Sequence, residues 1–201
     1  MQIWRFLGSR SSIRKVLLAA VFLLGYPLFV FAENMTPVQG DLEPVNYIAY
    51  TESLASSGQP SALEFQAAAK AGVERVIYLA FLDHDTSVPN EDRIVRDLGM
   101  QFAHIPVVWS APSLADFELF SAVMRQSEGV NTLVHCQVNW RASSFVFLYR
   151  AIYQGVPMND AVLALNSIWT PSEEWRKFIV DVLKAHNLEP NCEFCSALEG
   201  N

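Results

Sequence analysis

Three short apolar runs, each separated from the next by a stretch of helical length, constrain the fold of this chain most. The runs cover residues 73–80 (VERVIYLA), 101–108 (QFAHIPVV) and 131–135 (NTLVH). Their largely apolar, β-branched character is typical of buried strands, and helices between successive strands favour parallel βαβ units. The sequence therefore predicts an α/β fold with a central, mostly parallel sheet flanked by helices.

Capping residues predict where the helices begin and end. Ser61 and Glu64 have the spacing of a capping box, and they open a helix that Gly72 ends. A second capping box is expected from Thr170 to Glu173, with proline at the first helical position. Apolar side chains expected to face the core are Leu114, Phe117, Phe120 and Met124 in a helix over 113–126, and Trp175, Phe178, Ile179, Val182 and Leu183 in the last helix. Further helices are predicted at 90–98, 142–154 and 159–169.

The first 32 residues differ in character from the rest of the chain. The basic residues of this part are Arg5, Arg10, Arg14 and Lys15, followed from Val16 to Ala32 by VLLAAVFLLGYPLFVFA, a run without a charge. A basic region, an apolar region and small or short side chains before Glu33 predict a signal peptide at 1–32. An uncleaved anchor is the alternative, although the run is short for a membrane span. Both interpretations place the domain in the periplasm or otherwise outside the cytoplasm, with membrane contact only if the segment is not cleaved.

The remainder is predicted to hold one domain. Residues 33–44 are expected to be a flexible lead-in, 45–188 the domain, and 189–201 a C-terminal tail with a CxxC pair. Cleavage removes four of the 14 basic residues and none of the 21 acidic ones, so the net charge changes from −7 to −11. A charge of this sign argues against nucleic-acid binding, which needs a basic surface.

The cysteines are too few for a disulfide scaffold. They number three in the whole chain. In an oxidising compartment a local bond between Cys192 and Cys195 is the simplest state, which leaves Cys136 as a free thiol. A reversible bond between Cys136 and one of the tail cysteines is the alternative, since it would protect the thiol from over-oxidation.

The stretch from Leu133 to Ser144 reads LVHCQVNWRASS. A strand expected to end at His135 is followed by Cys136, four further residues, and Arg141 at the start of a hydrophobic helix. Ligands of open α/β sheets bind beyond the carboxyl ends of the strands, and a helix N-terminus favours an anion there. The same potential stabilises a thiolate, and an arginine can hold two oxygens of a tetrahedral oxyanion. This order of residues predicts a site for nucleophilic attack at phosphorus.

The motif resembles the active-site loop of the cysteine-dependent tyrosine and dual-specificity phosphatase superfamily. Its four-residue spacing is similar to a bacterial branch, the phosphatase-like domains also found fused to β-lactamase-like hydrolases, whose loop is Cys-x4-Arg. Residues 57–61 (SGQPS), 76–79 (VIYL) and 99–107 (GMQFAHIPV) resemble that branch as well. The resemblance covers about residues 45–155. It implies the phosphatase fold and the hydrolysis of phosphate monoesters without a metal or another cofactor.

The resemblance also implies roles for the residues of the loop. Cys136 is the expected nucleophile, which forms a phosphocysteine intermediate, and Arg141 is expected to bind the phosphoryl oxygens. His135 is expected to orient the loop. The remaining phosphate-binding groups are backbone N–H groups of Gln137, Val138, Asn139, Trp140 and Arg141.

Three loop positions depart from the superfamily pattern or add to it. Asn139 stands where a glycine is usual, and asparagine tolerates left-handed backbone angles better than most residues. Ala142 replaces the hydroxyl residue that usually follows the arginine, so Ser143 or Ser144 is expected to assist departure of the thiolate. Trp140 is expected to line the pocket and to favour an aromatic phosphate.

The general acid has no clear candidate. In dual-specificity relatives the general acid is an aspartate in the segment that connects a strand to the helix just before the nucleophile strand. The matching segment here, residues 107–112 (VVWSAP), contains no acid. The candidates are Asp83 or Asp85, on the loop after the predicted strand 73–80, and Asp116, in the next helix. Loss of general-acid help typically costs about 10²–10⁴ in rate. The neighbouring Asp83-His84-Asp85 run is expected to be a solvated loop rather than a metal site.

Three functions compete. The first is an exported phosphatase that acts on a phosphorylated protein or a small phosphate ester, with phosphotyrosine as the model substrate. The second is a rhodanese-like sulfurtransferase, whose active loop also has a short cysteine–arginine span. The third, suggested by the missing acid, is a phosphate-binding module with weak or no turnover.

Overall fold

The computed structural model describes residues 43–126, 129–192 and 194–195. The predicted signal peptide and the lead-in up to residue 42 lie outside this part and stay predictions. Within it, no helix combines the length and the apolar character needed to cross a lipid bilayer.

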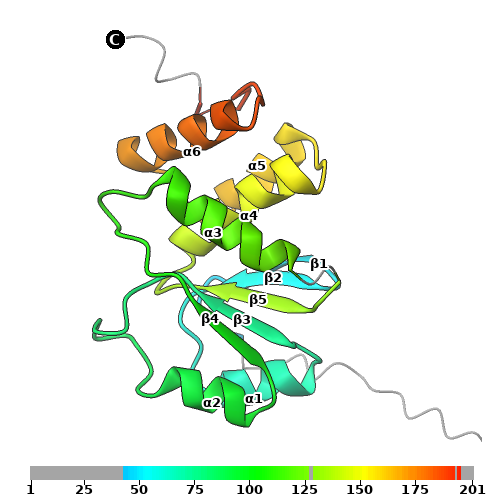
Figure 1. The fold of residues 1–201 in the computed structure, drawn as a ribbon, viewed down its shortest axis with the longest axis vertical. Coiled ribbons are helices and arrows are strands. Elements are labelled where there is room, and N and C mark those ends of the chain that lie inside the picture. Colours follow the sequence, from blue (N-terminus) through cyan, green and yellow to red (C-terminus); the bar gives the residue numbers. More distant parts are fainter. Residues whose placement is uncertain (1–42, 127–128, 193, 196–201) are drawn as a thin grey trace, which may run out of the picture. The chain divides into compact units, whose positions relative to one another are not determined.

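A five-stranded sheet forms the centre of the domain (Figure 1). Its strands in chain order are β1 (Ile48–Thr51), β2 (Leu54–Ser57), β3 (Arg75–Tyr78), β4 (Gln101–His104) and β5 (Thr132–His135). The spatial order is β1-β2-β5-β3-β4, in which β2, β5, β3 and β4 run parallel and β1 pairs antiparallel with β2. The predicted α/β fold with a mostly parallel sheet is confirmed, with β5 at the centre.

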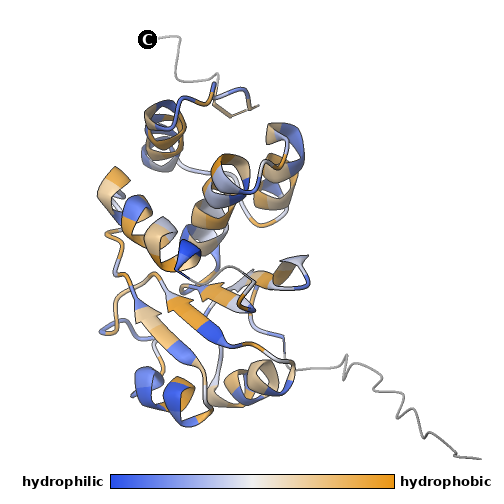
Figure 2. Cartoon of the chain, turned by 45° about the vertical axis from the view of Figure 1, so that its right-hand side comes forward, coloured by the Kyte–Doolittle hydropathy of each residue, from blue (hydrophilic) through white to orange (hydrophobic). Residues whose placement is uncertain are grey.

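Helices cover both faces of the sheet. They are α1 (Ala62–Lys70), α2 (Glu91–Asp97), α3 (Leu114–Arg125), α4 (Trp140–Tyr153), α5 (Met158–Asn166) and α6 (Glu173–Ala185). Figure 1 shows α1 and α2 on one face and the other four on the opposite face. A small core of Phe65, Val76, Val95 and Met100 lies under α1 and α2, and a larger core lies under α3 to α6. Figure 2 shows the hydrophobic character of the central strands between these layers.

Local sequence signals account for most element boundaries. Ser61 and Glu64 form the predicted capping box of α1, and Ser113 caps α3 through the backbone N–H of Asp116. Gly72 and Gly99 follow α1 and α2 with φ of +89° and +84°, the left-handed region that glycine adopts without a steric penalty. The helix ends read from these residues are therefore confirmed.

Three local predictions were wrong. Ser172, not Thr170, is the N-cap of α6, and its hydroxyl bonds the Glu174 carboxylate rather than a backbone N–H, so the second capping box does not form. Leu114 is 40% exposed rather than inward, because it opens α3 at the rim of the domain. The strand predicted over 101–108 ends at His104, before Pro106, which cannot donate a ladder hydrogen bond.

The sequence analysis also missed β1 and β2. Their sequences, IAYT and LASS, contain no apolar run, although β2 is largely buried beside β5. At the other end of the chain, Cys192 and Cys195 form the expected local disulfide. Phe194 packs against Phe147 of α4 with ring centroids 6.4 Å apart, so this part of the predicted tail belongs to the core.

Candidate active site

Cys136 lies directly after β5, at the carboxyl end of the central strand. Its side chain is fully buried and its thiol is free. The backbone N–H of Cys136 donates to the carbonyl of Ser57 over 3.3 Å, so the end of β2 fixes the start of the loop. The structure thus places the predicted nucleophile at the sheet edge where α/β folds bind ligands.

The segment after β2 presses closely against the loop. Gly58 forms an isolated bridge with Val138, and the N–H of Gln59 donates to the carbonyl of Gln137 over 3.0 Å. A Cβ atom at position 58 would lie 2.8 Å from the carbonyl oxygen of Gln137 and 2.9 Å from that of Val45. Only glycine allows this approach, which explains the SGQPS run noted in the sequence.

Two asparagines hold the middle of the loop. Asn139 is the N-cap of α4 and has φ of 71° and ψ of 0°, so the left-handed angles expected at this position are present. Its side-chain amide donates to the carbonyl of Asn46 over 2.6 Å, and the amide of Asn46 donates to the carbonyl of Val138 over 3.0 Å. This reciprocal pair ties the loop to the segment before β1 and fixes the turn into α4.

Arg141 is buried to 7% exposure and its guanidinium is held on three sides. Nε donates to the carbonyl of Val107 over 3.1 Å, Nη1 donates to Oε1 of Gln137 over 3.0 Å, and the group lies 5.1 Å from the ring centroid of Trp109. Burial lowers the pKa of Arg141, and the interaction with the Cys136 sulfur opposes this shift. The predicted arginine and the predicted nucleophile are therefore close enough to interact electrostatically.

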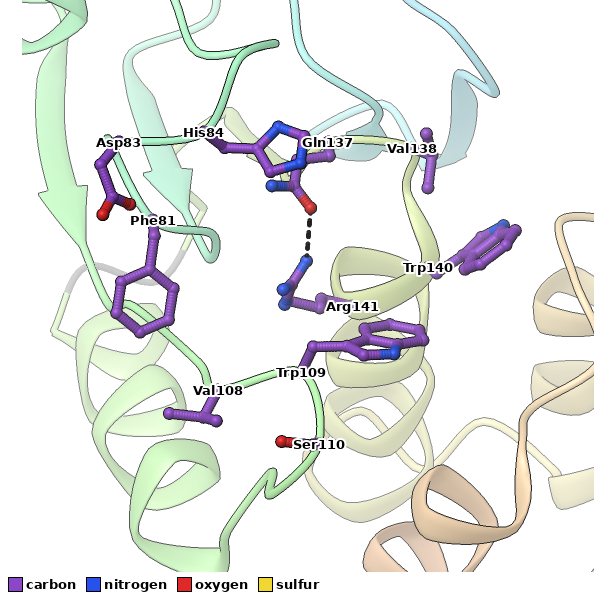
Figure 3. A pocket seen from close by; sticks show the side chains of 10 residues that line it. All are labelled: Phe81, Asp83, His84, Val108, Trp109, Ser110, Gln137, Val138, Trp140 and Arg141. Atoms are coloured by element: carbon purple, nitrogen blue, oxygen red, sulfur yellow. Dashed lines mark hydrogen bonds between the residues drawn. The ribbon is translucent and has the colours of Figure 1, made fainter.

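A pocket of about 670 Å³ opens in front of these residues (Figure 3). Its lining consists of Phe81, Asp83, His84, Val108, Trp109, Ser110, Gln137, Val138, Trp140 and Arg141. Cys136 is adjacent to this lining but contributes no surface of its own. Four of the five residues expected to bind phosphate are thus in the wall, and the fifth, Asn139, is fully buried behind it.

Aromatic side chains dominate one side of the pocket. Trp140 stacks on Trp169 with centroids 5.1 Å apart and planes inclined by 7°. Trp109 contacts both and also Trp175, whose Nε1 donates to the carbonyl of Trp109 over 3.0 Å. Trp140 lines the pocket as expected. Trp109 was missed because it lies 31 residues from Trp140 in the sequence and no local pattern connects them.

A buried pair, His135 and Glu91, supports the start of the loop. Nε2 of His135 lies 3.0 Å from Oε1 of Glu91, and both side chains are fully buried. Gln59 donates to the other Glu91 oxygen over 2.6 Å, and the ring of His135 stacks on Tyr78 with centroids 4.6 Å apart. His135 is therefore fixed in orientation by groups from three segments. The sequence analysis missed Glu91, because nothing local distinguishes a buried glutamate from the exposed acids common in a first helical turn.

The three acidic candidates occupy different environments. Asp116 accepts from the N–H and the hydroxyl of Ser113 over 3.0 and 2.7 Å, so its carboxylate caps α3 and does not line the pocket. Asp85 is exposed and also lies outside the lining, whereas Asp83 is part of it. The hydroxyls of Ser143 and Ser144 both donate to the carbonyl of Trp140. Among the residues that the structure describes, no group of three metal-binding side chains is present.

Comparison with known proteins agrees with this geometry. No protein-family model matches the chain. Over 118 residues it is 32% identical to the β-lactamase hydrolase-like protein of Xylella fastidiosa, in a match that covers 57% of this chain. That match covers 27% of the Xylella protein, so the chain spans about a quarter of the length of these curated relatives.

Solved structures share the fold. A candidate phosphatase (DUF442) of Shewanella putrefaciens CN-32 is 32% identical, with a TM-score of 0.66 over 75% of this chain and 97% of that protein. TpbA of P. aeruginosa, solved in complex with phosphotyrosine, is 14% identical with a TM-score of 0.52 over 81% of this chain and 96% of its own, a likeness of fold alone. The high coverage and identity of the Shewanella protein show that the chain belongs to the DUF442 family, and its fold is shared with the more distant solved phosphatases.

Proposed function

We propose that this protein is an exported phosphatase that hydrolyses phosphate monoesters of aromatic alcohols, such as phosphotyrosine, through a phosphocysteine intermediate. One observation carries the proposal: Arg141, in the wall of the pocket, interacts with the thiol of Cys136, which is buried next to that wall at the end of the central strand. A cation fixed beside a thiol at a helix N-terminus suits a group that brings negative charge to the sulfur.

The loop offers the donors that a phosphoryl group needs. The left-handed angles of Asn139 turn the chain into α4, and consecutive N–H groups in such a turn form a concave anion site. Val107 holds Nε of Arg141, so the guanidinium is oriented before substrate binds. Preorganised donors of this kind stabilise the charge that develops in the transition state without reorganising.

The reaction takes place in two displacements. The Cys136 thiolate attacks phosphorus, an S–P bond forms, and the P–O bond to the alcohol breaks. Water then attacks the phosphocysteine, which releases inorganic phosphate and restores the thiolate. The alcohol must gain one proton in the first step and the water must lose one in the second.

The aromatic and aliphatic side chains around Arg141 favour a substrate that carries an aromatic ring. Trp109 and Trp140 present partly exposed rings, and Phe81, Val108 and Val138 are exposed around them. A flat ring attached to the phosphate can stack on such surfaces, which adds about 0.5–1.5 kcal/mol per aromatic pair beyond area burial. The strongly acidic domain also favours a compact phosphate over a polyanion.

The test uses protein expressed from the full chain and kept under mild reductant, with Cys136→Ser and Arg141→Lys as variants. Wild-type protein should hydrolyse aryl phosphates, Cys136→Ser should be inactive, and mass spectrometry of acid-quenched wild-type reactions should find one phosphoryl group on Cys136. Activity that survives Cys136→Ser, or that depends on a divalent metal, would contradict the mechanism.

The same preparations separate the two competing functions. Transfer of sulfur from thiosulfate to cyanide without phosphate hydrolysis would support the sulfurtransferase. Binding of vanadate without hydrolysis of any phosphate ester would support the phosphate-binding module. Export is tested separately by fractionating the cells and sequencing the mature N-terminus, which should begin at Glu33 if the signal peptide is cleaved.

A further inference from the structure

In the described part of the chain, the pocket has no carboxylate at the position where dual-specificity relatives carry the general acid. Residues 107–112 contain none, and Asp116 is committed to the cap of α3. The side chains in the lining that are of the types used as general acids are Asp83 and His84. The donor must therefore come from the loop between β3 and α2, or the enzyme lacks one.

We propose that His84 donates the proton to the leaving oxygen and later accepts one from the attacking water. This inference rests on the phosphatase function proposed above. In Figure 3 the imidazole of His84 extends towards the Gln137–Arg141 pair, whereas the carboxylate of Asp83 lies on the side of Phe81. Of the two, only the imidazole is directed to the place where the phosphorus–oxygen bond would break.

Thr86 prepares His84 for this exchange. Nδ1 of His84 lies 2.9 Å from the hydroxyl oxygen of Thr86 and 3.2 Å from its backbone nitrogen. The backbone N–H of Thr86 can donate to an Nδ1 that carries no proton, whereas the hydroxyl of Thr86 can accept from an Nδ1 that carries one. The hydroxyl of Thr86 therefore offers a partner to a protonated Nδ1, which leaves Nε2 for the proton exchange.

The loop that carries His84 is tied to the sheet. The N–H of Ser87 donates to the carbonyl of His84 over 2.8 Å, and the hydroxyl of Ser87 donates to the carbonyl of Phe81 over 3.0 Å. Tyr78, the last residue of β3, donates to the same carbonyl over 2.9 Å. Since Tyr78 also stacks on His135, the loop and the nucleophile are positioned by the same side chain.

The proton balance closes with this assignment. In the first step Nε2–H of the imidazolium passes its proton to the alcohol oxygen as the P–O bond breaks, and the ring becomes neutral with its remaining proton on Nδ1, donated to Thr86. In the second step the free Nε2 takes a proton from water as oxygen attacks phosphorus and the S–P bond breaks. The imidazolium and the thiolate are both restored, and no other reactant is needed.

The experiment compares two aryl phosphates, phenyl phosphate and p-nitrophenyl phosphate, because the second releases a much more acidic phenol that needs little protonation. His84→Asn retains an acceptor for the N–H of Thr86 but removes the proton donor, and His84→Gln places an amide near Nε2 that cannot release a proton. His186→Asn makes the same change at a histidine outside the pocket, at the end of α6. Asp83→Asn tests the competing donor.

We expect both His84 variants to lose about 10²-fold or more in kcat on phenyl phosphate, the scale of general-acid catalysis, and less than about 10-fold on p-nitrophenyl phosphate. Imidazole added to His84→Ala should restore part of the rate on phenyl phosphate only, and His186→Asn should behave as wild type on both. An equal loss on both substrates, or a leaving-group-dependent loss in Asp83→Asn instead, would overturn the assignment. If wild-type protein hydrolyses neither ester, the proposed function itself has failed, and the assignment with it.

Discussion

Two buried arginines lie at opposite ends of the same sheet, and they differ in what satisfies them. Arg75 begins β3 at the amino end and is 3% exposed, and Arg141 follows β5 at the carboxyl end and is 7% exposed. Burial lowers the pKa of both. Arg75 donates to the hydroxyl of Thr132 and to the carbonyls of Val123 and Met124, so it acts as a cap for the end of α3.

Arg141 has fewer fixed partners and a reactive neighbour. Val107 and Gln137 accept one hydrogen bond each, the guanidinium lies over the ring of Trp109, and it interacts electrostatically with Cys136. A pocket also lies beside Arg75, of about 310 Å³, but there the guanidinium already has its acceptors. Burial and a lowered pKa are therefore not sufficient to identify an arginine that binds a ligand. The N–H donors that remain without an acceptor in the described part of the chain, and the groups beside them, distinguish the two arginines.

The largest effect on activity is expected from a substitution of Arg141, at the carboxyl end of the sheet. Arg141→Lys keeps the charge but loses the planar fork, so kcat/KM for an aryl phosphate should fall about 10²–10³-fold, as when one transition-state donor is removed. The melting temperature should change little. Steady-state kinetics and thermal unfolding measure the two effects, and a loss of stability without a loss of turnover would make Arg141 the equivalent of Arg75.

Arg75→Met should give the opposite result. It removes the donors to two carbonyls and one hydroxyl in a buried setting, and the free energy of unfolding should fall by about 2–3 kcal/mol. The folded protein should keep its kcat. Urea denaturation followed by assay of the folded fraction makes the comparison, which would break down if kcat fell while stability held.

Asn139 tests whether the loop geometry itself matters. Asn139→Ala loses the bond to Asn46 and must adopt a left-handed φ, so it should cost about 2 kcal/mol of stability together with activity. Asn139→Gly loses the bond but adopts the angles freely, and it should recover about half of that cost. Equal behaviour of the two variants in unfolding and kinetic assays would show that the backbone angle is unimportant.

The smallest effect concerns the aromatic wall at the carboxyl end. Trp140→Ala should raise KM for an aryl phosphate about 10-fold, since one stacking surface is lost, while KM for an alkyl phosphate stays within about 2-fold. Trp140→Phe keeps a ring and serves as the matched control. A parallel rise in KM for both esters would instead mean that Trp140 supports the loop through Trp169.

The elements that the sequence predicted well depend on neighbours in the chain. The capping box of Ser61 and the helix ends at Gly72 and Gly99 involve hydrogen bonds and backbone angles within a few residues. The loop from Cys136 to Arg141 was found for the same reason, because its residues follow one another closely between a strand and a helix. By contrast, β2 is buried by its position beside β5, and its own residues give no sign of it.

The amino-acid sequence by itself determined the class of fold, the position of the Cys136–Arg141 loop, and the absence of an acid from residues 107–112. Tertiary structure alone decided which distant groups support that loop. Asn46 lies 92 residues from Val138, and Val107 lies 34 residues from Arg141. Tertiary structure also placed both Asp83 and His84 in the pocket lining, with the imidazole extending towards the Gln137–Arg141 pair and the carboxylate on the side of Phe81. Such contacts depend on how strands and helices stack, whereas periodicity and capping record only interactions within one element and its ends.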